Sequence, residues 1–259
     1  MTPTTARRPY RFAFQQEAAR EGDPRSGRRG RSADPGELRP YREGDDVRSI
    51  NWRAYARHQE LVVPDPQTDD PAGLIILQDG RPGMDLHRKH EHARALSAVL
   101  AAGATPTQHH DLDASGRPAA GLDAQLRAWH ARHASAPRNQ ALLIVSDLME
   151  PAPFGPAATK LAREAAEMNV VQLLASREVR PPAEPRRLRD VNTGARHLAP
   201  ASAAAYQDAL LRHTAACAAW VHSAGGRYLQ LVVQDAEPDE RWLLTRLRQA
   251  GWVTPTARR

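Results

Sequence analysis

Four short apolar runs, separated by longer mixed stretches, set the pattern of the chain after residue 70. They cover residues 74–77, 141–145, 170–174 and 228–233. Short apolar runs bounded by polar residues are typical of strands that are buried on both faces of a sheet. The pattern therefore predicts four buried strands.

Apolar residues at helical spacing fill most of the intervals between these runs. They predict helices over 88–102, 120–134, 157–168 and 201–224, and a last helix that starts near Pro238 and stops at Gly251. The 201–224 helix ends at Gly225-Gly226, a favourable C-cap. Its apolar stripe consists of Tyr206, Leu210, His213, Cys217, Trp220 and Ala224. The last helix is expected to bury Leu243, Leu244 and Leu247.

Buried strands that alternate with helices predict the doubly wound α/β class, a mostly parallel sheet covered on both faces. The order of elements fits one domain over residues 71–255. The stretch 104–119 is read as a weak hairpin that turns at residues 114–116. Two further segments precede the domain: an arm over residues 1–35 and a charged module over residues 36–70.

Each apolar run is followed by a polar residue. These are Asp79, Ser146-Asp147, Ser176 and Asp235, in chain order. In open α/β sheets, ligands bind at the carboxyl ends of the strands. That rim is therefore where we expect a site.

Positive charge is concentrated at the start of the chain. The formal net charge is +6, and residues 1–31 hold eight arginines against three acids. A solvated, partly disordered tail is favoured here over a nucleic-acid or membrane-surface arm, because blocks of like charge often have no specific partner.

Several function classes lack support in the sequence. Cys217 is the single cysteine, which excludes an intrachain disulfide and favours a cytosolic location. The apolar runs are too short to span a bilayer. Glycine-rich nucleotide loops and the G-x-S-x-G motif of serine hydrolases are absent, so we expect a non-enzyme without a cofactor.

The stretch "ELRPYREGDDVRSINWRAYAR", residues 37–57, mixes arginines and acids around Trp52. It resembles the signature of the domain-of-unknown-function 58 (DUF58) family, approximately R-x-Y-x-x-G-D-D-x-R-x-I-D-W-x-x-x-A-R. Asn51 stands where that family usually has Asp. The matching residues are Arg39, Tyr41, Gly44, Asp45, Asp46, Arg48, Ile50, Trp52, Ala56 and Arg57.

The resemblance continues through "LIILQDGRPGM", "LLIVSDL" and "VNTGARHL". It implies a von Willebrand factor A-like domain preceded by the charged module. Such proteins are commonly associated with MoxR-type AAA+ ATPases, and their own role is thought to be that of an adaptor. The resemblance thus implies a non-catalytic scaffold that binds protein partners.

The charged module has two physical interpretations. Gly44 permits a tight turn, Asp45 or Asp46 can cap a helical turn, and Val47, Ile50 and Trp52 can anchor the module to the sheet domain. A buried guanidinium needs carboxylate partners, so an ionic clasp is expected from Arg39, Arg48, Arg53 and Arg57 with Glu43, Asp45 and Asp46. The alternative is a docking surface that exposes Tyr41 and Arg42. The clasp is favoured.

The resemblance also implies a metal site that is degenerate in this chain. Von Willebrand A domains bind Mg²⁺ through an Asp-x-Ser-x-Ser loop, whose hydroxyls are hard oxygen ligands. The loop here is Asp79-Gly80-Arg81-Pro82-Gly83, and both hydroxyls are lost. We expect Arg81 to bridge Asp79 and Asp147 in place of the ion, without a bound metal. Asp85 is a possible substitute ligand.

Three alternatives stay open. The arginine-rich arm can bind nucleic acid weakly and in a salt-sensitive way. A metal-dependent hydrolase can be built from Asp79, Asp147 and Asp235. A zinc site, which is less favoured than solvated side chains, would draw on His87, His90, His92, His109, His110, Asp111 and Asp113.

Overall fold

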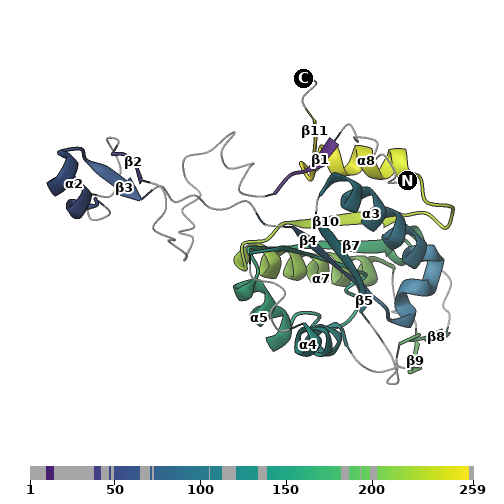
Figure 1. The fold of residues 1–259 in the computed structure, drawn as a ribbon. Coiled ribbons are helices and arrows are strands. Elements are labelled where there is room, and N and C mark those ends of the chain that lie inside the picture. The colour runs from purple at the N-terminus through teal and green to yellow at the C-terminus, as the bar shows by residue number, and fades with distance from the viewer. Residues whose placement is uncertain are drawn as a thin grey trace. The chain divides into compact units, whose positions relative to one another are not determined.

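In the computed structural model the chain forms two compact units, and Figure 1 labels their helices and strands. Met1–Gln15 and Pro71–Arg259 form the first, which we call the α/β unit, and Gln16–Asp70 forms the second, which we call the signature unit. The residues that the structure describes are 10–14, 38–41, 47, 50–64, 71, 73–104, 106–112, 121–133, 139–181, 187–192, 194–198 and 203–256.

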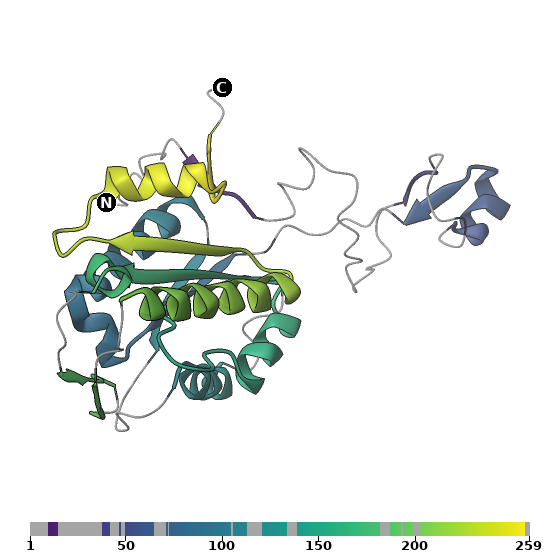
Figure 2. The ribbon, with the colours of Figure 1, turned by 180° about the vertical axis from the view of Figure 1, so that it is seen from behind.

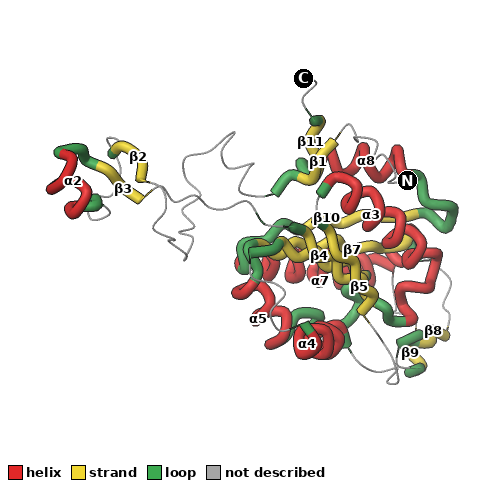
Figure 3. The backbone as a smooth tube through the Cα atoms, viewed as in Figure 1, coloured by secondary structure: helices red, strands yellow, loops and turns green. Residues whose placement is uncertain are grey.

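A parallel sheet of five strands forms the centre of the α/β unit (Figure 3). The strands are β4 (Leu74–Asp79), β5 (Thr107–Leu112), β6 (Ala141–Ser146), β7 (Glu167–Ala175) and β10 (Tyr228–Val233). Each of the four apolar runs lies in one of them. The order across the sheet is β10-β7-β6-β4-β5, so the direction of chain progression reverses between β4 and β6.

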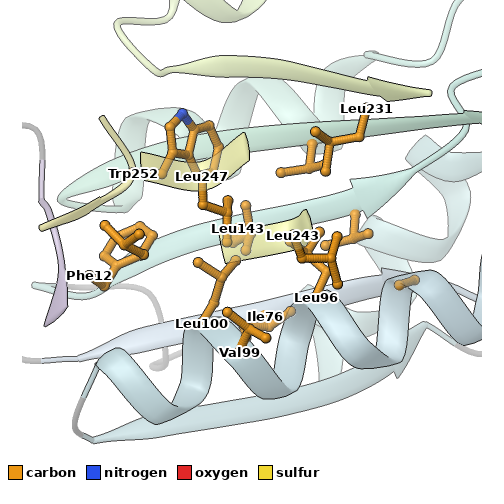
Figure 4. Packing of buried hydrophobic residues seen from close by; sticks show 14 of the residues in the cluster. Phe12, Ile76, Leu96, Val99, Leu100, Leu143, Leu231, Leu243, Leu247 and Trp252 are labelled. Carbon is orange, nitrogen blue, oxygen red and sulfur yellow. The ribbon is translucent and has the colours of Figure 1, made fainter. Parts of the chain in front are cut away.

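Helices cover both faces of this sheet (Figures 1 and 2). Successive strand residues point to opposite faces, which is why Ile76 and Ile75 belong to different core clusters. The Ile76 cluster contains side chains of α3 (Lys89–Gly103) and α8 (Glu240–Gln249), as Figure 4 shows. The Ile75 cluster packs against α4 (Leu122–Arg132), α5 (Pro156–Glu164) and α7 (Ala203–Ser223). The predicted parallel α/β architecture is confirmed and is compatible with a Rossmann-like fold.

The helix predictions hold for element type, with one error at a boundary. Helix α5 ends at Glu164, whereas the sequence predicts helix through 168. Residues from Glu167 onward belong to β7, although Glu167 and Asn169 are polar. Their side chains are satisfied inside the protein: the Asn169 amide donates to Glu167 at 2.7 Å, and Arg227 lies 3.7 Å from Glu167.

The hairpin expected over 104–119 is wrong in its described part. Residues Thr107–Leu112 form β5, which pairs in parallel with β4 at the edge of the sheet. Gln108, His109 and Asp111 are exposed, because an edge strand is covered less well than a central one. An exposed edge strand tolerates polar residues, and these polar residues are the reason why the sequence indicated a weak hairpin and not a buried strand. The expected turn at 114–116 lies outside the described residues.

Residues 10–14 belong to the core of the α/β unit and not to a solvated arm. Strand β1 (Tyr10–Phe12) pairs antiparallel with β11 (Val253–Pro255). Phe12 is almost fully buried and contacts Trp252 edge to face at 6.3 Å. Arg227 stacks over both rings and donates a hydrogen bond to Ala13 O at 2.6 Å. Burial lowers the pKa of Arg227, and Glu167 partly offsets that effect. The rest of the expected arm lies outside the described residues.

The described part of the signature unit is small. Strands β2 (Leu38–Pro40) and β3 (Val62–Pro64) pair antiparallel, and α2 (Trp52–His58) precedes β3 in the chain. Asn51 is the N-cap of α2, because its Oδ1 accepts a hydrogen bond from Ala54 N at 3.1 Å. Asn and Asp cap helices about equally well, so Asn51 serves this cap as an Asp would.

The side chains expected to anchor the signature unit differ in burial. Ile50 is buried, whereas Val47 and Trp52 are exposed. No residue of α2 is buried. The anchoring of Val47, Ile50 and Trp52 to the sheet domain stays a prediction. Among the described helices of both units, none is long and apolar enough to cross a membrane.

Candidate functional site

The carboxyl ends of β4 and β6 bring Asp79 and Asp147 together at the reversal of strand order. Asp79 is the last residue of β4, and Asp147 follows the last residue of β6. These two strands are neighbours, and ligand sites of open α/β sheets lie at such a switch point. Both carboxylates are buried. Asp79 and Asp147 therefore lie together at this rim of the sheet.

Arg81 occupies the space between the two carboxylates. Its Nε lies 3.0 Å from each Asp79 oxygen, and its Nη2 lies 2.6 Å from Asp79 Oδ2. The same Nη2 lies 3.4 Å from Asp147 Oδ1. Ser146 completes the contact, because its hydroxyl donates to Asp79 Oδ2 at 2.6 Å. The bond to Asp79 is therefore bidentate and buried, the strongest form of a guanidinium–carboxylate pair.

A third carboxylate, Glu150, lies on the other side of Arg81. Its Oε1 is 3.0 Å from Arg81 Nη1 and accepts a hydrogen bond from Leu122 N at 2.9 Å. Burial alone would lower the pKa of Arg81, but hydrogen bonding to Asp79 and the surrounding carboxylates raises it above its ordinary value. Burial raises the pKa of Glu150, and Arg81 offsets this only in part. Arg81 is thus a permanent cation.

Lys89 is a second buried cation of this site, and its side chain is fully buried. Its Nζ donates to Asp147 Oδ2 at 2.9 Å and to Glu178 Oε1 at 2.5 Å. Glu178 belongs to the short helix α6 (Ser176–Val179) after β7. Each oxygen of Asp147 therefore faces a different cation, Arg81 or Lys89. Three carboxylates and two cations thus alternate in the order Glu150, Arg81, Asp147, Lys89 and Glu178, and Asp79 is a further partner of Arg81.

A kink in the backbone places Lys89 at the rim. The chain leaves the 3₁₀ helix η2 (Pro82–Arg88) with two successive left-handed residues, His87 (φ 53°) and Arg88 (φ 59°). Residues other than glycine rarely adopt this backbone conformation, and those that do cluster at functional sites. Arg88 is held by Glu91 at 2.6 Å and also contacts Glu237. These contacts fix the start of α3 against the loop after β10.

Close packing around Asp147 leaves no room for larger neighbours. A Cβ atom on Gly83 would lie 2.7 Å from Asp147 Oδ2. Gly83 N donates to Asn192 Oδ1 at 2.9 Å. Asn192 lies in the loop between β8 (Arg187–Arg189) and β9 (Arg196–Leu198). Leu148, the residue after Asp147, is buried with a left-handed φ of 54°.

The residues present at the rim do not fit a divalent cation. Both Asp79 oxygens accept hydrogen bonds from Arg81, and one also accepts from Ser146. A hard cation needs six or more oxygen ligands, and the loop supplies no hydroxyl at 81 or 83. Asp85 is exposed in η2. The described residues contain no group of three His, Cys, Asp or Glu side chains suited to a metal.

The histidines of the zinc alternative have other partners. His87 lies 3.5 Å from Asp235, and His92 lies 3.1 Å from the carbonyl oxygens of both Gln234 and Ala236. His109 and His110 lie on β5, and Asp113 is outside the described residues. Asp235 follows β10, three strands from β4, or about 14 Å at the usual strand spacing. A joint site of Asp79, Asp147 and Asp235 is therefore not formed.

Cys217 and His213 are adjacent but do not form a nucleophile–base pair. Their Sγ and Nε2 atoms are 3.7 Å apart. The same Nε2 lies 2.7 Å from Leu148 O, and a carbonyl oxygen can only accept a hydrogen bond, so this nitrogen carries the proton. Burial raises the pKa of Cys217 to about 11. The thiol therefore stays protonated and unreactive at neutral pH.

The signature residues are described in part. Tyr41 is half-buried, Ile50 is buried, Asn51 caps α2, and Trp52 is exposed. Arg53 and Arg57, which were expected in the ionic clasp, are exposed, and no ion pair joins either of them to a described residue. Arg39 lies in β2, and its side chain is outside the description. Arg42, Glu43, Gly44, Asp45, Asp46 and Arg48 lie outside the described residues.

Sequence reasoning missed three charged members of the site: Lys89, Glu150 and Glu178. A signal was available, since an isolated lysine in an arginine-rich chain stands at the start of the helix that follows the Asp79 loop. Glu178 lies three residues after the end of β7 and accepts a hydrogen bond from Ala175 N at 2.7 Å. Its place near the rim could have been inferred from that spacing.

The fold and this site define an α/β protein with a buried ion-pair network at the sheet's switch point. Residues 37–111 match the family described as "Protein of unknown function DUF58". This match supports the DUF58 resemblance found in the sequence. No curated protein and no solved structure matches the chain.

Proposed function

We propose that the protein is a non-catalytic scaffold, with a von Willebrand factor A-like domain, that works together with a MoxR-type AAA+ ATPase. The match to DUF58 supports the family context of this proposal. The observation that carries it is the position of Arg81, whose guanidinium fills the space between Asp79 and Asp147. Because Arg81 is paired with carboxylates from several segments, the rim of the sheet is held in one arrangement, and such a fixed surface is suited to binding a protein partner.

The same geometry argues against the metal-dependent hydrolase. Such an enzyme uses a cation with an open coordination position to activate water or polarise the substrate. Replacing Arg81 by a metal would require breaking its bidentate bond to Asp79 in a buried site. Removing one partner of a buried pair costs about 3 to 5 kcal/mol. The network therefore disfavours an exchange of cation for metal.

A reconstituted binding experiment tests the proposal. The full chain is mixed with the purified MoxR-type ATPase of the same host, with ATP, with ADP and without nucleotide. We expect a complex whose affinity differs between the nucleotide states, because an ATPase changes shape through its cycle and a scaffold is expected to favour one state. The absence of a complex in all three conditions would overturn the proposal.

A catalytic control accompanies this measurement. Phosphodiester and phosphomonoester substrates are offered to the chain with Mg²⁺, Mn²⁺ or Zn²⁺. The scaffold proposal expects no turnover above that of the variant Asp79→Asn. Turnover that disappears in Asp79→Asn would establish the hydrolase instead.

A further inference from the structure

Strand β10 is an edge strand that lacks the usual protection against pairing with another chain. Among the described strands it has one neighbour, β7, and it lies between α7 and α8 (Figure 2). Its sequence, Tyr-Leu-Gln-Leu-Val-Val, contains no charge and no proline, the residues that normally protect an edge. Strand β5, at the opposite edge of the sheet, carries the exposed residues His109 and Asp111. Strand β10 is therefore the better template for a further strand.

The backbone of β10 directs alternate residues away from β7. Val170 N donates to Arg227 O at 2.9 Å, so the backbone of Arg227 faces β7. In a parallel ladder, successive residues of a strand direct their N–H and C=O groups alternately to its two sides. The N–H and C=O groups of Tyr228, Gln230 and Val232 therefore face the outer side of β10, where a strand of another chain can pair with them.

These outward residues are complementary to the same residues of a second copy. In an antiparallel pair, two residues that face each other exchange both of their hydrogen bonds. With Gln230 on the twofold axis, Gln230 lies opposite the partner's Gln230, and Tyr228 lies opposite the partner's Val232. A parallel pair does not allow this exchange, because there a residue that faces its neighbour lies opposite one that faces away. The edge therefore fits an antiparallel, closed dimer.

The charges beside the two ends of β10 are complementary in the same arrangement. The segment after its carboxyl end carries the exposed acids Asp235, Glu237, Asp239 and Glu240. Arg88, which pairs with Glu237, offsets only part of this charge. The amino end of β10 lies by the end of α8, because Arg227 donates to Gly251 O at 3.2 Å, and the last turn of α8 carries the exposed Arg246 and Arg248. An antiparallel partner brings the acidic segment of each copy to the arginine end of the other.

Helix α7 places an apolar side chain on the same side of the unit. Leu211 is 66% exposed and Val232 is 36% exposed. Leu211 and Trp220 are nine residues apart, or about two and a half turns, so they point to opposite sides of α7. Trp220 stacks at 4.2 Å on Phe154, which lies between β6 and α5. Leu211 therefore points away from β6, toward the β10 edge.

We infer that β10 pairs antiparallel with β10 of a second copy, so that two α/β units share one continuous sheet. Leu211 and Val232 of each copy lie beside this contact and lose exposed apolar surface in the dimer. Tyr228 and the partner's Val232 form an aromatic–aliphatic pair, a type of cross-strand pair that stabilises sheets. The inference does not depend on the proposed function.

Sedimentation velocity of the full chain at micromolar concentration tests the dimer. Gln230→Pro is expected to give a monomer, because it removes the outward N–H at the axis and leaves the hydrogen bonds to β7 in place. The matched control is His109→Pro on β5. There Leu74 N donates to Pro106 O, so the same alternation turns the N–H of His109 away from β4. The wild type and His109→Pro should both be dimers.

A second variant removes any ambiguity from misfolding. Gln230→Lys keeps the backbone N–H but brings two like charges together on the axis, so it should weaken dimerisation by about tenfold. Circular dichroism of each variant shows whether the α/β unit is folded. If Gln230→Pro does not fold, the result for Gln230→Lys decides.

Disulfide formation tests the register. In Gln230→Cys the two opposed Cα atoms are about 5.5 Å apart, which is within the range of a disulfide. Val232→Cys is the control, because two copies of position 232 are about 14 Å apart along the strands in this register. The native Cys217 is buried. Mild oxidation should therefore crosslink Gln230→Cys into a covalent dimer and leave Val232→Cys uncrosslinked.

Three results would overturn the inference. The first is a wild type that is monomeric at micromolar concentration. The second is a folded Gln230→Pro or Gln230→Lys that dimerises as strongly as the wild type, or a dimer that only His109→Pro dissociates, since the contact then lies elsewhere. The third is a crosslink in Val232→Cys but not in Gln230→Cys, which excludes the pairing about Gln230.

Discussion

Arg81 Nη2 lies 2.6 Å from Asp79 Oδ2, with 5% of the Arg81 side chain and none of the Asp79 side chain exposed. A charge pair buried to this extent is stable only while both partners are present, because either charge alone is poorly solvated. Asp147 and Glu150 depend on the same guanidinium. The stability of the α/β unit is therefore coupled to one residue of the loop after β4.

Arg81→Ser should lower the free energy of unfolding by about 3 to 5 kcal/mol, since it leaves three carboxylates close together. Urea denaturation at neutral pH measures the loss. Arg127→Ser is the matched control: Arg127 also pairs with a carboxylate, that of Asp123, but its side chain is 69% exposed, so its loss should be small. Equal losses in the two variants would show that burial of the Arg81 pair contributes nothing.

Magnesium provides the second measurement on Arg81→Ser. A ligand that binds only the folded state raises its stability, so millimolar Mg²⁺ should partly restore the variant and leave the wild type unchanged. A magnesium-dependent thermal shift in the wild type would revive a metal at the rim. If Mg²⁺ leaves the melting temperature of Arg81→Ser unchanged, the remaining oxygens cannot form a cation site.

Lys89→Met should be about as destabilising as Arg81→Ser, by about 3 to 5 kcal/mol, because Asp147 and Glu178 lose their common cation. The double variant Lys89→Met/Glu178→Gln should lose less free energy of unfolding than the sum of the losses in the two single variants. Denaturation of the two single variants and the double variant gives the coupling. Strict additivity would indicate that the buried ammonium does not stabilise Glu178.

Gly83→Ala should cost about 1 to 3 kcal/mol, because the added methyl group would lie against Asp147 Oδ2. The prediction has an internal control. In an Asp147→Ala background the obstructing oxygen is gone, and the additional cost of Gly83→Ala should largely disappear. The same penalty in both backgrounds would place the obstruction elsewhere.

The parts of the fold that the sequence predicted are those with a local signal. Runs such as 141–145 are buried because their own composition is apolar, and their strand type follows from length alone. The proximity of Asp79 and Asp147 followed from a second rule, that parallel strands end at a common rim. Neither inference needs knowledge of side-chain contacts.

The parts that were missed depend on tertiary contacts. A lysine is normally exposed, and Lys89 is buried only because Asp147 and Glu178 surround it. Glu167 was assigned to the end of a helix, and its partner Arg227 is sixty residues away in sequence. The backbone is left-handed at His87, Arg88 and Leu148, and the residue types at these positions do not predict this conformation. Such features exist only once the fold brings distant residues together.

Cys217 should be resistant to alkylation in the folded protein. Its pKa of about 11, raised by burial, leaves almost no thiolate at pH 8. Because the chain has one cysteine, the incorporation of iodoacetamide followed by mass spectrometry reports on this thiol alone. We expect labelling only in denaturant, and no change in the rate for His213→Ala. Fast labelling of the native chain that His213→Ala slows would establish an activated thiol.

His110 should make the protein less stable in mild acid. Burial lowers the pKa of His110, and the neighbouring His133 and His109 lower it further. Its folded pKa is therefore below the ordinary value of about 6.5 that applies in the unfolded chain. Between these two pKa values the unfolded state binds more protons than the folded state. The contribution of His110 to the free energy of unfolding is therefore fully present above about pH 6.5 and is lost as the pH falls through that window.

Replacing His110 by Phe tests this pH dependence. The ring can still contact Trp129, which His110 meets edge to face at 5.6 Å, but the titrating group is gone. The decline in melting temperature between about pH 7 and pH 5 should become shallower than in the wild type. His222→Gln is the control, because His222 is exposed near the end of α7 and its removal should leave the slope unchanged. A wild-type slope retained in His110→Phe would assign the acid sensitivity to other groups.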